Sequence, residues 1–328
     1  MKRTLNVFLI GWLFACACTY AAAETTITEW TVPWPETRPR DPAVAADGLV
    51  WFVGQRGDYV ASLDPRDGEF RKLPLDPGTG PHNLIVSGSD TIWYAGNTAA
   101  HIGRMDAAAG AIEKIPMPDP KARDPHTLVF DASGDIWFTV QGGNFVGKLD
   151  VDSRAVRLIP VPTPNARPYG ILPDPNGTIW VVEFGSFKLA RIDPETFALT
   201  EIALPRDGAR PRRLAITRDG SVWYADYAQG FLGRRAADGE FTEWAMPSGE
   251  GSRPYAMAVD AKDRLWVVET GVDPNRLVGF DPATGRFFGE ITIPSGGGTV
   301  RHMVYHAPTH SLWFGTDTNT LGRARLPD

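Results

Sequence analysis

Short runs of alternating apolar and polar residues, separated by small polar turns, recur along the chain after residue 24. One unit reads GPHNLIVS, TIWYAGN, HIGRMD and AIEKIPMP, with turn residues between the runs. Alternation with a period of two predicts β-strands with one buried face, and the Gly, Asp and Asn between the runs predict tight turns. Each unit therefore predicts four antiparallel strands, which we name a to d in chain order.

A tryptophan follows a small polar turn in each of seven units, as in AADGLVW and TRDGSVW. The seven are separated by 42 to 47 residues: Trp51, Trp93, Trp137, Trp180, Trp223, Trp266 and Trp313. A period of 40–50 residues with several short strands per unit is typical of β-propellers. We therefore predict an all-β, seven-bladed β-propeller with four-stranded antiparallel blades, in which each tryptophan fills the wedge between neighbouring sheets.

The two ends of the repeat predict how the ring closes. The segment ITEWTVP (27–33) matches the fourth-strand phrase FTEWAMP (241–247), whereas the chain ends on LGRARLPD, a third-strand phrase. We therefore expect the N-terminal segment to supply the outer strand of the seventh blade, which would protect that edge from unwanted pairing. Residues 24–328 are then a single domain without a linker.

The first 23 residues read as a secretion signal, with two basic residues, an apolar run over residues 7–17 and an A-x-A cleavage site at 21–23. Both cysteines of the chain fall inside this leader, so the mature protein would contain none. An alternative is lipidation at Cys16. Either interpretation predicts an exported protein, periplasmic or secreted.

The net charge and the lengths of the apolar runs exclude some classes of binding partner. The chain has a formal net charge of −6 over 328 residues and no basic stripe, which argues against nucleic acid as a partner. Outside the leader no apolar run is long enough to span a bilayer, so we expect no transmembrane segment. A closed ring leaves no obligatory interface, and we expect a monomer that acts on a small molecule or peptide.

A ring of chemically rich residues is predicted at one face. Strand a runs from this face to the other and strand b returns, so the start of strand a and the residues just after each tryptophan meet near the central channel. Eleven residues before the tryptophans stand Arg40, His82, His126, Tyr169, Arg212, Tyr255 and His302. Three or four residues after the tryptophans of blades 3 to 6 stand Gln141, Glu183, Asp226 and Glu269.

The second and third blades carry the strongest candidate chemistry. GPHN presents His82, and RDPHT presents Asp124 and His126 across one proline. Because residues i and i+2 of a strand point the same way, Asp124 and His126 can address one point. This set could hold Mg²⁺ or Mn²⁺, or transfer protons. Alternatively, these polar groups only bond the backbone of the loops between blades.

Arginines form a second candidate cluster at the same face. Arg38, Arg167, Arg210 and Arg253 each precede a ring position by two residues, and Arg212 and Arg301 add to them. We expect part of this cluster to pair with Glu183, Asp226 and Glu269. The functional alternative is a guanidinium cluster that binds an anionic group of a ligand.

The blade phrase PNARPYGI…GTIWVVEFGSFKLARID and the pair GPHN…RDPHT resemble the streptogramin B lyase family, at the level of the repeat over the whole mature chain. Members of that family are seven-bladed propellers that open cyclic depsipeptide antibiotics by Mg²⁺-dependent elimination at the ester, without hydrolysis. The family's order of a His, a Glu-Pro-His and a Pro-Tyr-Gly at successive inner strands appears here as His82, then Asp124-Pro125-His126, then Pro168-Tyr169-Gly170.

The resemblance implies roles for these residues. His126 would be the general base or acid, His82 would orient or polarise the substrate ester, and Asp124 and Gln141 would hold Mg²⁺. Asp124 replaces a longer Glu, and Gln141 stands where the family has a second metal carboxylate. Because a neutral amide oxygen is a poorer ligand for a hard cation, we expect weakened metal binding. The substrate-binding side chains would be Tyr169, Arg212, Tyr255, His302, Glu183 and Glu269.

Three functions follow from these observations. The first is an exported, metal-assisted carbon–oxygen lyase that acts on an ester of a cyclic depsipeptide or similar small molecule. The second is a non-catalytic periplasmic propeller that binds a ligand or protein through its charged face. A lactone hydrolase is the third, and seven tryptophans count against it because those enzymes resemble six-bladed propellers.

Overall fold

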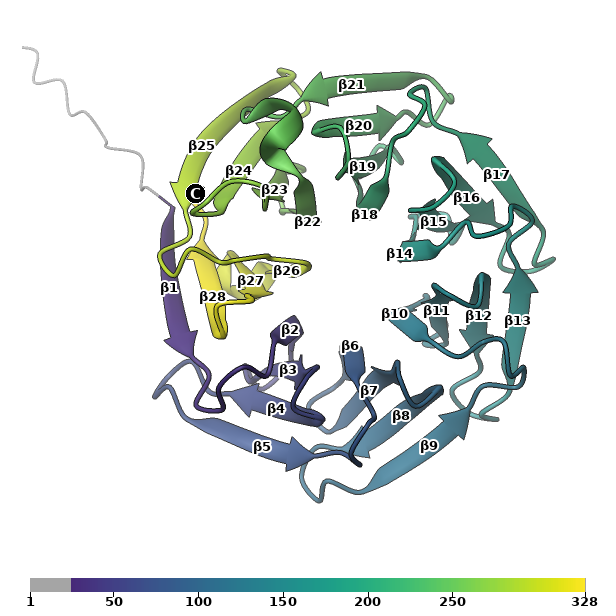
Figure 1. Cartoon of the computed structure of the whole chain (residues 1–328), viewed down its shortest axis with the longest axis vertical. Coiled ribbons are helices and arrows are strands. Elements are labelled where there is room, and N and C mark those ends of the chain that lie inside the picture. The colour runs from purple at the N-terminus through teal and green to yellow at the C-terminus, as the bar shows by residue number, and fades with distance from the viewer. Residues whose placement is uncertain (1–24, 328) are drawn as a thin grey trace, which may run out of the picture.

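The computed structural model describes residues 25–327, which form seven four-stranded antiparallel sheets around a central channel (Figure 1). In blades 1 to 6 the four strands follow one another from the channel outward, so the predicted architecture is confirmed. The predicted leader, its cleavage site and its two cysteines lie outside the described residues. Within residues 25–327, no helix is long and apolar enough to cross a membrane.

The strands are short and regularly spaced. Blades 1 to 3 comprise β2 Pro39–Val44, β3 Val50–Gly54, β4 Tyr59–Leu63, β5 Phe70–Pro74, β6 Pro81–Ser87, β7 Thr91–Gly96, β8 His101–Asp106, β9 Ile112–Pro116, β10 Pro125–Phe130, β11 Ile136–Val140, β12 Phe145–Leu149 and β13 Val156–Pro160. Blades 4 and 5 comprise β14 Pro168–Pro173, β15 Ile179–Glu183, β16 Lys188–Ile192, β17 Leu199–Ala203, β18 Pro211–Ile216, β19 Val222–Asp226, β20 Phe231–Arg235 and β21 Phe241–Ala245. Blades 6 and 7 comprise β22 Pro254–Val259, β23 Leu265–Glu269, β24 Arg276–Asp281, β25 Arg286–Thr292, β26 Met303–His306, β27 Ser311–Gly315, β28 Thr320–Arg325 and β1 Thr26–Thr31, and two 3₁₀ turns span Gly249–Ser252 and Ala307–Thr309.

The N-terminal strand closes the ring as the sequence predicts. Strand β1 pairs antiparallel with β28, from Thr26 opposite Arg325 to Thr31 opposite Thr320. Figure 1 shows β1 as the outermost strand beside β28, so the two ends of the described chain are hydrogen-bonded in one blade. The seventh sheet is therefore built from both ends of the chain, and β28 is left with no open edge.

The seven tryptophans fill the space between blades, as predicted. Each is at most 5 % exposed, and most of them belong to apolar clusters that join two neighbouring blades, as Trp93 does with Leu128 and Phe138. Four also donate their indole N–H to the turn between strands a and b, as Trp137 does to Asp131 at 2.9 Å. The repeated turn phrase therefore both forms the turn and provides a polar side chain that accepts a hydrogen bond from the buried indole N–H.

The glycine that recurs in the third strand has a packing reason. At Gly103 and Gly147 an added Cβ would overlap the rings of Tyr94 and Phe138, which lie flat against the backbone of the adjacent strand. A methyl group there would push the ring out of the apolar cluster between the sheets. The Gly-Arg and Gly-Lys phrases are therefore a requirement of core packing.

Candidate functional site

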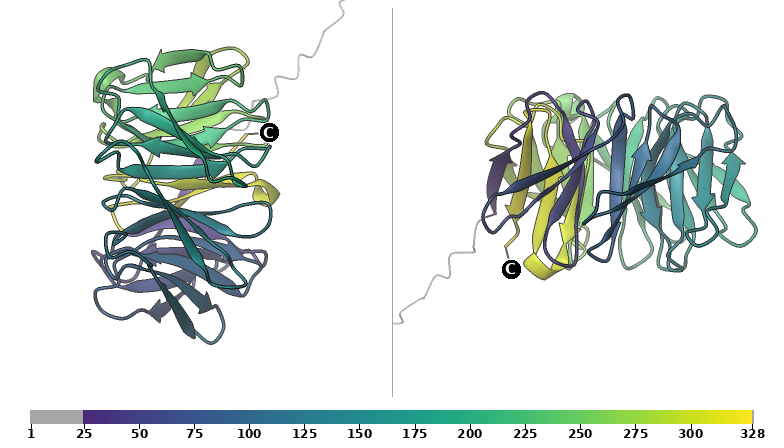
Figure 2. Two further views of the ribbon diagram at one scale, coloured as in Figure 1. Left: turned by 90° about the vertical axis from the view of Figure 1, so that its right-hand side faces the viewer. Right: turned by 90° about the horizontal axis from the view of Figure 1, so that it is seen from below.

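Seven side chains gather at the start of the inner strands, as the sequence predicts from one offset before each tryptophan. We call this set the ring: Arg40, His82, His126, Tyr169, Arg212, Tyr255 and His302. In the edge-on views the strands run across the disc from one face to the other (Figure 2). In blades 1 to 6 the pairing of strand a with strand b is irregular just where the ring residue sits, as between Pro125 and Leu128. Arg40, His82, His126, Tyr169 and Tyr255 are buried, whereas Arg212 and His302 are partly exposed.

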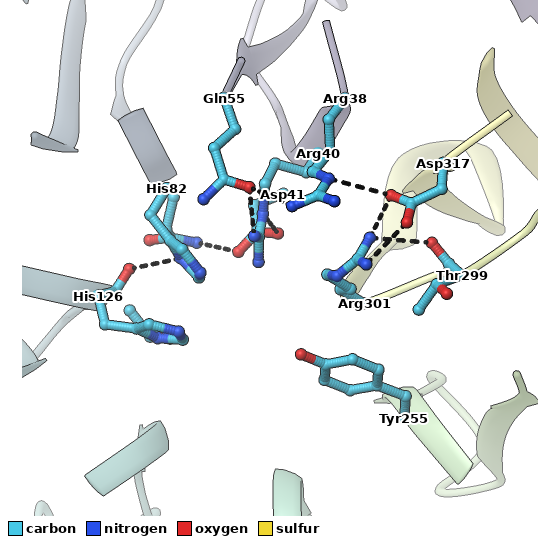
Figure 3. A network of polar contacts seen from close by, with 12 residues as sticks. Arg38, Arg40, Asp41, Gln55, His82, His126, Tyr255, Thr299, Arg301 and Asp317 are labelled. Carbon is cyan, nitrogen blue, oxygen red and sulfur yellow. Dashed lines mark hydrogen bonds and ion pairs between the residues drawn. The ribbon is translucent and has the colours of Figure 1, made fainter. Parts of the chain in front are cut away.

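The two imidazoles of blades 2 and 3 lie against each other. The ring centroids of His82 and His126 are 3.6 Å apart, and the Tyr169 ring lies 4.1 Å beyond His126. Nδ1 of His82 lies 3.2 Å from the carbonyl oxygen of His126 (Figure 3). A carbonyl only accepts, so Nδ1 of His82 carries the proton, and in the neutral ring Nε2 keeps the lone pair that a base requires.

Burial keeps these imidazoles uncharged. It lowers the pKa of His82 well below the usual value, and the guanidiniums of Arg40 and Arg213 lower it further. Burial also lowers the pKa of His126, helped by His82 and Arg213. The pKa of His302 falls to about 3 for the same main reason, burial, with Arg213 adding to it. All three rings are therefore free bases at neutral pH.

The depressed histidine pKa values predict a loss of stability in mild acid. In the unfolded chain a histidine titrates near pH 6.5, so below that pH protonation favours the unfolded state. The free energy of unfolding should be fully retained above pH 6.5 and should fall by up to about 1.4 kcal/mol per pH unit per buried histidine below it. Urea unfolding at pH 7.5, 6 and 5 measures this slope, and His302→Gln should reduce it. A free energy that stays constant down to pH 5 would contradict the prediction.

The opposite side of the ring is aromatic and cationic. The hydroxyls of Tyr169 and Tyr255 are hydrogen-bonded to each other, and Arg212 donates to the Tyr255 hydroxyl at 2.9 Å. The Arg212 guanidinium also lies over the rings of Tyr227 and Phe184, at 4.1 and 4.3 Å. Burial raises the pKa of Tyr169, but Arg213, Arg40 and Arg212 together lower it more, whereas burial raises the pKa of Tyr255. This side of the site favours a negative charge.

A buried ionic network, which the sequence analysis did not identify, joins Arg40 of the ring to residues that directly follow other ring positions. Asp41 accepts from Arg40 at 3.0 Å and from Arg213 at 3.2 Å, and it also accepts from Asn83 at 3.1 Å. Arg213 in turn donates to the Thr127 hydroxyl at 3.1 Å and to the carbonyl oxygen of Arg301. Arg213 therefore ties its own blade to blades 1 and 3 and to the loop before β26.

The residues of this network also share one position in the repeat. Asp41, Asn83, Thr127 and Arg213 each stand one residue after a ring position, ten before the tryptophan. A regular strand would point them away from the ring side chains, and we considered only the ring offset. The irregular pairing at this point brings both consecutive residues to the channel.

Asp124, one of the two candidate metal ligands, has other partners. Asp124 precedes the first residue of β10, and its carboxylate accepts from the backbone amides of Gly142 and Gly143, the latter at 3.0 Å. The carboxylate of Asp124 therefore contacts the turn after Gln141. His126 instead contacts His82 and Tyr169. The two side chains do not meet at one point, contrary to what alternation along a strand predicts. Across residues 25–327 no three His, Asp or Glu side chains converge as a metal ion requires. Because backbone amides engage Asp124 and Gln141 carries no charge, we derive no step through Mg²⁺.

The carboxylates at the ends of the second strands hold loops. Glu183 is fully buried and accepts from the Ser186 hydroxyl, and burial raises its pKa to about 7. Glu269 accepts from the backbone amide of Ser248 at 2.8 Å and pairs with Arg276 at 3.0 Å. These contacts are structural. They give no direct support to the predicted role of Glu183 and Glu269 in binding substrate.

Asp226 has the same structural use. Within residues 25–327, Glu183, Asp226 and Glu269 form no ion pair with the arginine cluster that the sequence predicts as their partner. Asp226 accepts from the backbone amide of Arg210 at 2.8 Å, not from its guanidinium. Arg38 instead lies 3.5 Å from Asp317, which also pairs with Arg301 (Figure 3). Three arginines two residues before the ring positions have a left-handed backbone, with φ of 53°, 53° and 45° at Arg38, Arg167 and Arg253. That backbone turns the chain into strand a.

Comparison with known proteins gives one family and several matching folds. The sequence profile described as the virginiamycin B lyase family matches residues 17–187, just over half of the chain. No curated protein sequence matches the chain significantly.

Among solved structures, a streptogramin B lyase shares 24% sequence identity at a TM-score of 0.83, and the match covers 93% of this chain and 98% of that one. A virginiamycin B lyase from Staphylococcus aureus gives 24% identity and a TM-score of 0.83, covering 92% and 100%. A catalytically inactive form of that enzyme with quinupristin gives 23% identity, with a TM-score of 0.83 and the same coverage. At these identities the likeness shows a common fold.

Proposed function

The chain belongs to the virginiamycin B lyase family, and from this premise we propose that it is an exported carbon–oxygen lyase that opens an ester of a cyclic depsipeptide or similar small molecule. The observation that carries the proposal is the pair of neutral imidazoles of His82 and His126, in contact with each other beside a cluster of guanidiniums. The predicted N-terminal leader would place this site in the periplasm or outside the cell.

The proposed reaction needs a base and a positive environment. An imidazole takes the proton from a carbon next to a carbonyl group, and a carbon–carbon double bond forms as the adjacent carbon–oxygen bond of the ester breaks. The acid leaves as a carboxylate, and the imidazolium gives its proton back to the solvent or the product. The mass of the opened product equals that of the substrate, because no water is added.

This chain's own cations would stabilise the negative charge that develops in the reaction. Arg212 borders the imidazoles through Tyr169 and Tyr255, and Arg40 belongs to the same ring and donates to Asp41. Fixed positive groups in a site that excludes water stabilise such charge more than solvent does. We assign Arg212 to this role because it is partly exposed and can meet a ligand.

The burial of the imidazoles favours a second candidate, a propeller that binds its ligand without turnover. His126 is 1% exposed and His82 is 5% exposed, so a substrate reaches them only if ring side chains move. The neutral side chain of Gln141 and the backbone contacts of Asp124 also favour this second candidate, because a site that only binds a ligand does not need charged metal ligands.

One experiment separates the two candidates. The purified protein is incubated with a streptogramin B antibiotic, with Mg²⁺ or with chelator, and the products are analysed by mass spectrometry. A linear product of unchanged mass supports the lyase, and a product heavier by one water would show hydrolysis. Unchanged antibiotic that binds the protein in a parallel calorimetric titration would establish the second candidate.

The variant His126→Ala tests the role of the imidazole pair. We expect turnover to fall by at least about 100-fold, the usual contribution of a positioned general base. His306→Ala, at a partly exposed histidine before the last 3₁₀ turn, is the matched control and should keep full activity. Thermal unfolding of both variants checks folding, and a folded His126→Ala protein with normal turnover would refute the assignment.

A further inference from the structure

A cavity of about 360 Å³ lies between the inner strands β10, β14, β18, β22 and β26. It is lined by the later residues of the inner strands, where these strands approach the opposite face of the disc. We call it the funnel. Its volume lies in the range of small-molecule sites in proteins.

The walls of the funnel are apolar. Ile171, Leu214 and Met257 line it and are buried, and Leu172 forms part of the wall as a half-buried residue. An apolar ligand in the funnel would gain contacts with these side chains that water does not provide, so the funnel favours an apolar occupant. This preference differs from that of the ring, whose side chains are polar or charged.

The base of the funnel is polar and carries excess positive charge. Arg213 and His302 both line it. A guanidinium has five N–H groups, and hydrogen bonds within residues 25–327 engage three of those of Arg213. Asp41 is the carboxylate shared by Arg213 and Arg40, so two buried cations have one anion between them.

An unmet hydrogen bond points to the same place. Nδ1 of His302, which lines the funnel, is buried and has no hydrogen-bond partner within the described residues. Buried polar groups are nearly always satisfied, and a buried charge without a full partner destabilises the folded state. An anion at the base of the funnel would accept from Arg213 and from the imidazole N–H of His302.

We propose that the funnel is a second binding site, which takes a small organic carboxylate with its head at Arg213 and His302 and its apolar body against Ile171, Leu214 and Met257. The proposal does not rest on the proposed lyase reaction, because Arg213 and His302 hold the head group and that reaction is assigned to His82, His126, Arg212 and Arg40.

Isothermal titration calorimetry with three probes tests the chemistry of the site. The probes are 4-phenylbutyrate, its neutral analogue 4-phenylbutanamide, and acetate, which has the head without the body. We expect 4-phenylbutyrate to bind at least about tenfold more tightly than either of the others. Equal binding of the amide would overturn the anionic head, equal binding of acetate would overturn the apolar body, and no binding of 4-phenylbutyrate at millimolar concentration would overturn the site.

A matched pair of variants tests the location. Leu172→Glu places a negative charge on the funnel wall, and Leu172→Gln places a neutral group of the same shape there. Binding of 4-phenylbutyrate should weaken at least about tenfold in the first and stay within about threefold in the second. Unchanged binding by a folded Leu172→Glu protein, or an equal loss in both variants, would refute the funnel as the location. Thermal unfolding confirms that both variants are folded.

Discussion

A protein that lacks residues 25–34 is expected to lose the stable closed ring, because these residues form the outer strand of a blade whose other strands come from the end of the chain. Strand β1 makes the whole backbone ladder with β28 and brings Trp30 onto Trp313, with ring centroids 5.5 Å apart. Val32, directly after it, is 2 % exposed in the same apolar cluster. Removal exposes these surfaces and leaves β28 as an open edge.

Polar contacts add to the expected effect of this deletion. The Glu29 carboxylate accepts from the backbone amide of Ser295 at 2.6 Å and from the hydroxyls of Ser295 and Thr320 at 2.7 and 2.6 Å. These bonds tie the closing strand to the loop before β26 and to β28. We expect the deletion to cost at least about 5 kcal/mol, which is most or all of the stability of an ordinary domain.

Circular dichroism during thermal unfolding, together with gel filtration, measures this result. The deleted protein should show no cooperative transition or should associate through its open edge. Trp30→Ala should give an intermediate loss of about 2 kcal/mol, because this ring is only partly buried. Thr26→Ala, at an exposed position of the same strand, is the control and should leave the midpoint unchanged. A deleted protein with the parent midpoint would show that β1 is not needed for closure.

Asp41→Asn is expected to destabilise the protein by roughly 3–5 kcal/mol, because it removes the carboxylate that two buried guanidiniums share. Asp41 is 1% exposed, and it lies 3.0 Å from Arg40 and 3.2 Å from Arg213. Asparagine keeps the shape of the side chain and tolerates the left-handed backbone, with φ of 48° at this position. The loss of stability in Asp41→Asn therefore measures the effect of removing the negative charge and not a change in side-chain packing.

The pH dependence of this pair has a definite sign. Burial raises the pKa of Asp41, but Arg40 and Arg213 outweigh it, and the pKa in the folded state lies below the usual value. The contribution of Asp41 is therefore complete above about pH 4 and is lost as the pH falls below the unfolded-state value. This window lies below that of the buried histidines, so the two effects can be told apart.

Urea unfolding at pH 7.5 measures the effect of Asp41→Asn. Asp64→Asn is the control, since it breaks an exposed ion pair with Arg66 and should change stability little. Adding Arg213→Met to Asp41→Asn should recover part of the loss, because it removes one of the unpaired buried cations. If Asp41→Asn is as stable as its parent, the network does not stabilise the fold.

Most of the fold could be predicted from the sequence, because it depends on local patterns repeated seven times. The spacing of the tryptophans determined the number of blades, and alternation determined the strands of each blade. The ring was found in the same way, since His82, His126 and Tyr169 hold one offset in successive repeats. The function could be taken only to the level of the family, since its chemistry depends on single side chains such as Gln141.

The sequence by itself determined which residues stand at the start of each inner strand and that the chain's first strand completes its last blade. Only the tertiary structure decided what those residues contact. Where the strand pairing is irregular, Asp41 and Arg213 form a buried ion pair between two blades. Backbone amides bind the carboxylate of Asp124. The physical reason is that periodicity fixes the position of a residue within its strand. The contact between Asp41 and Arg213, which are 172 residues apart in the sequence, depends instead on how the closed ring packs.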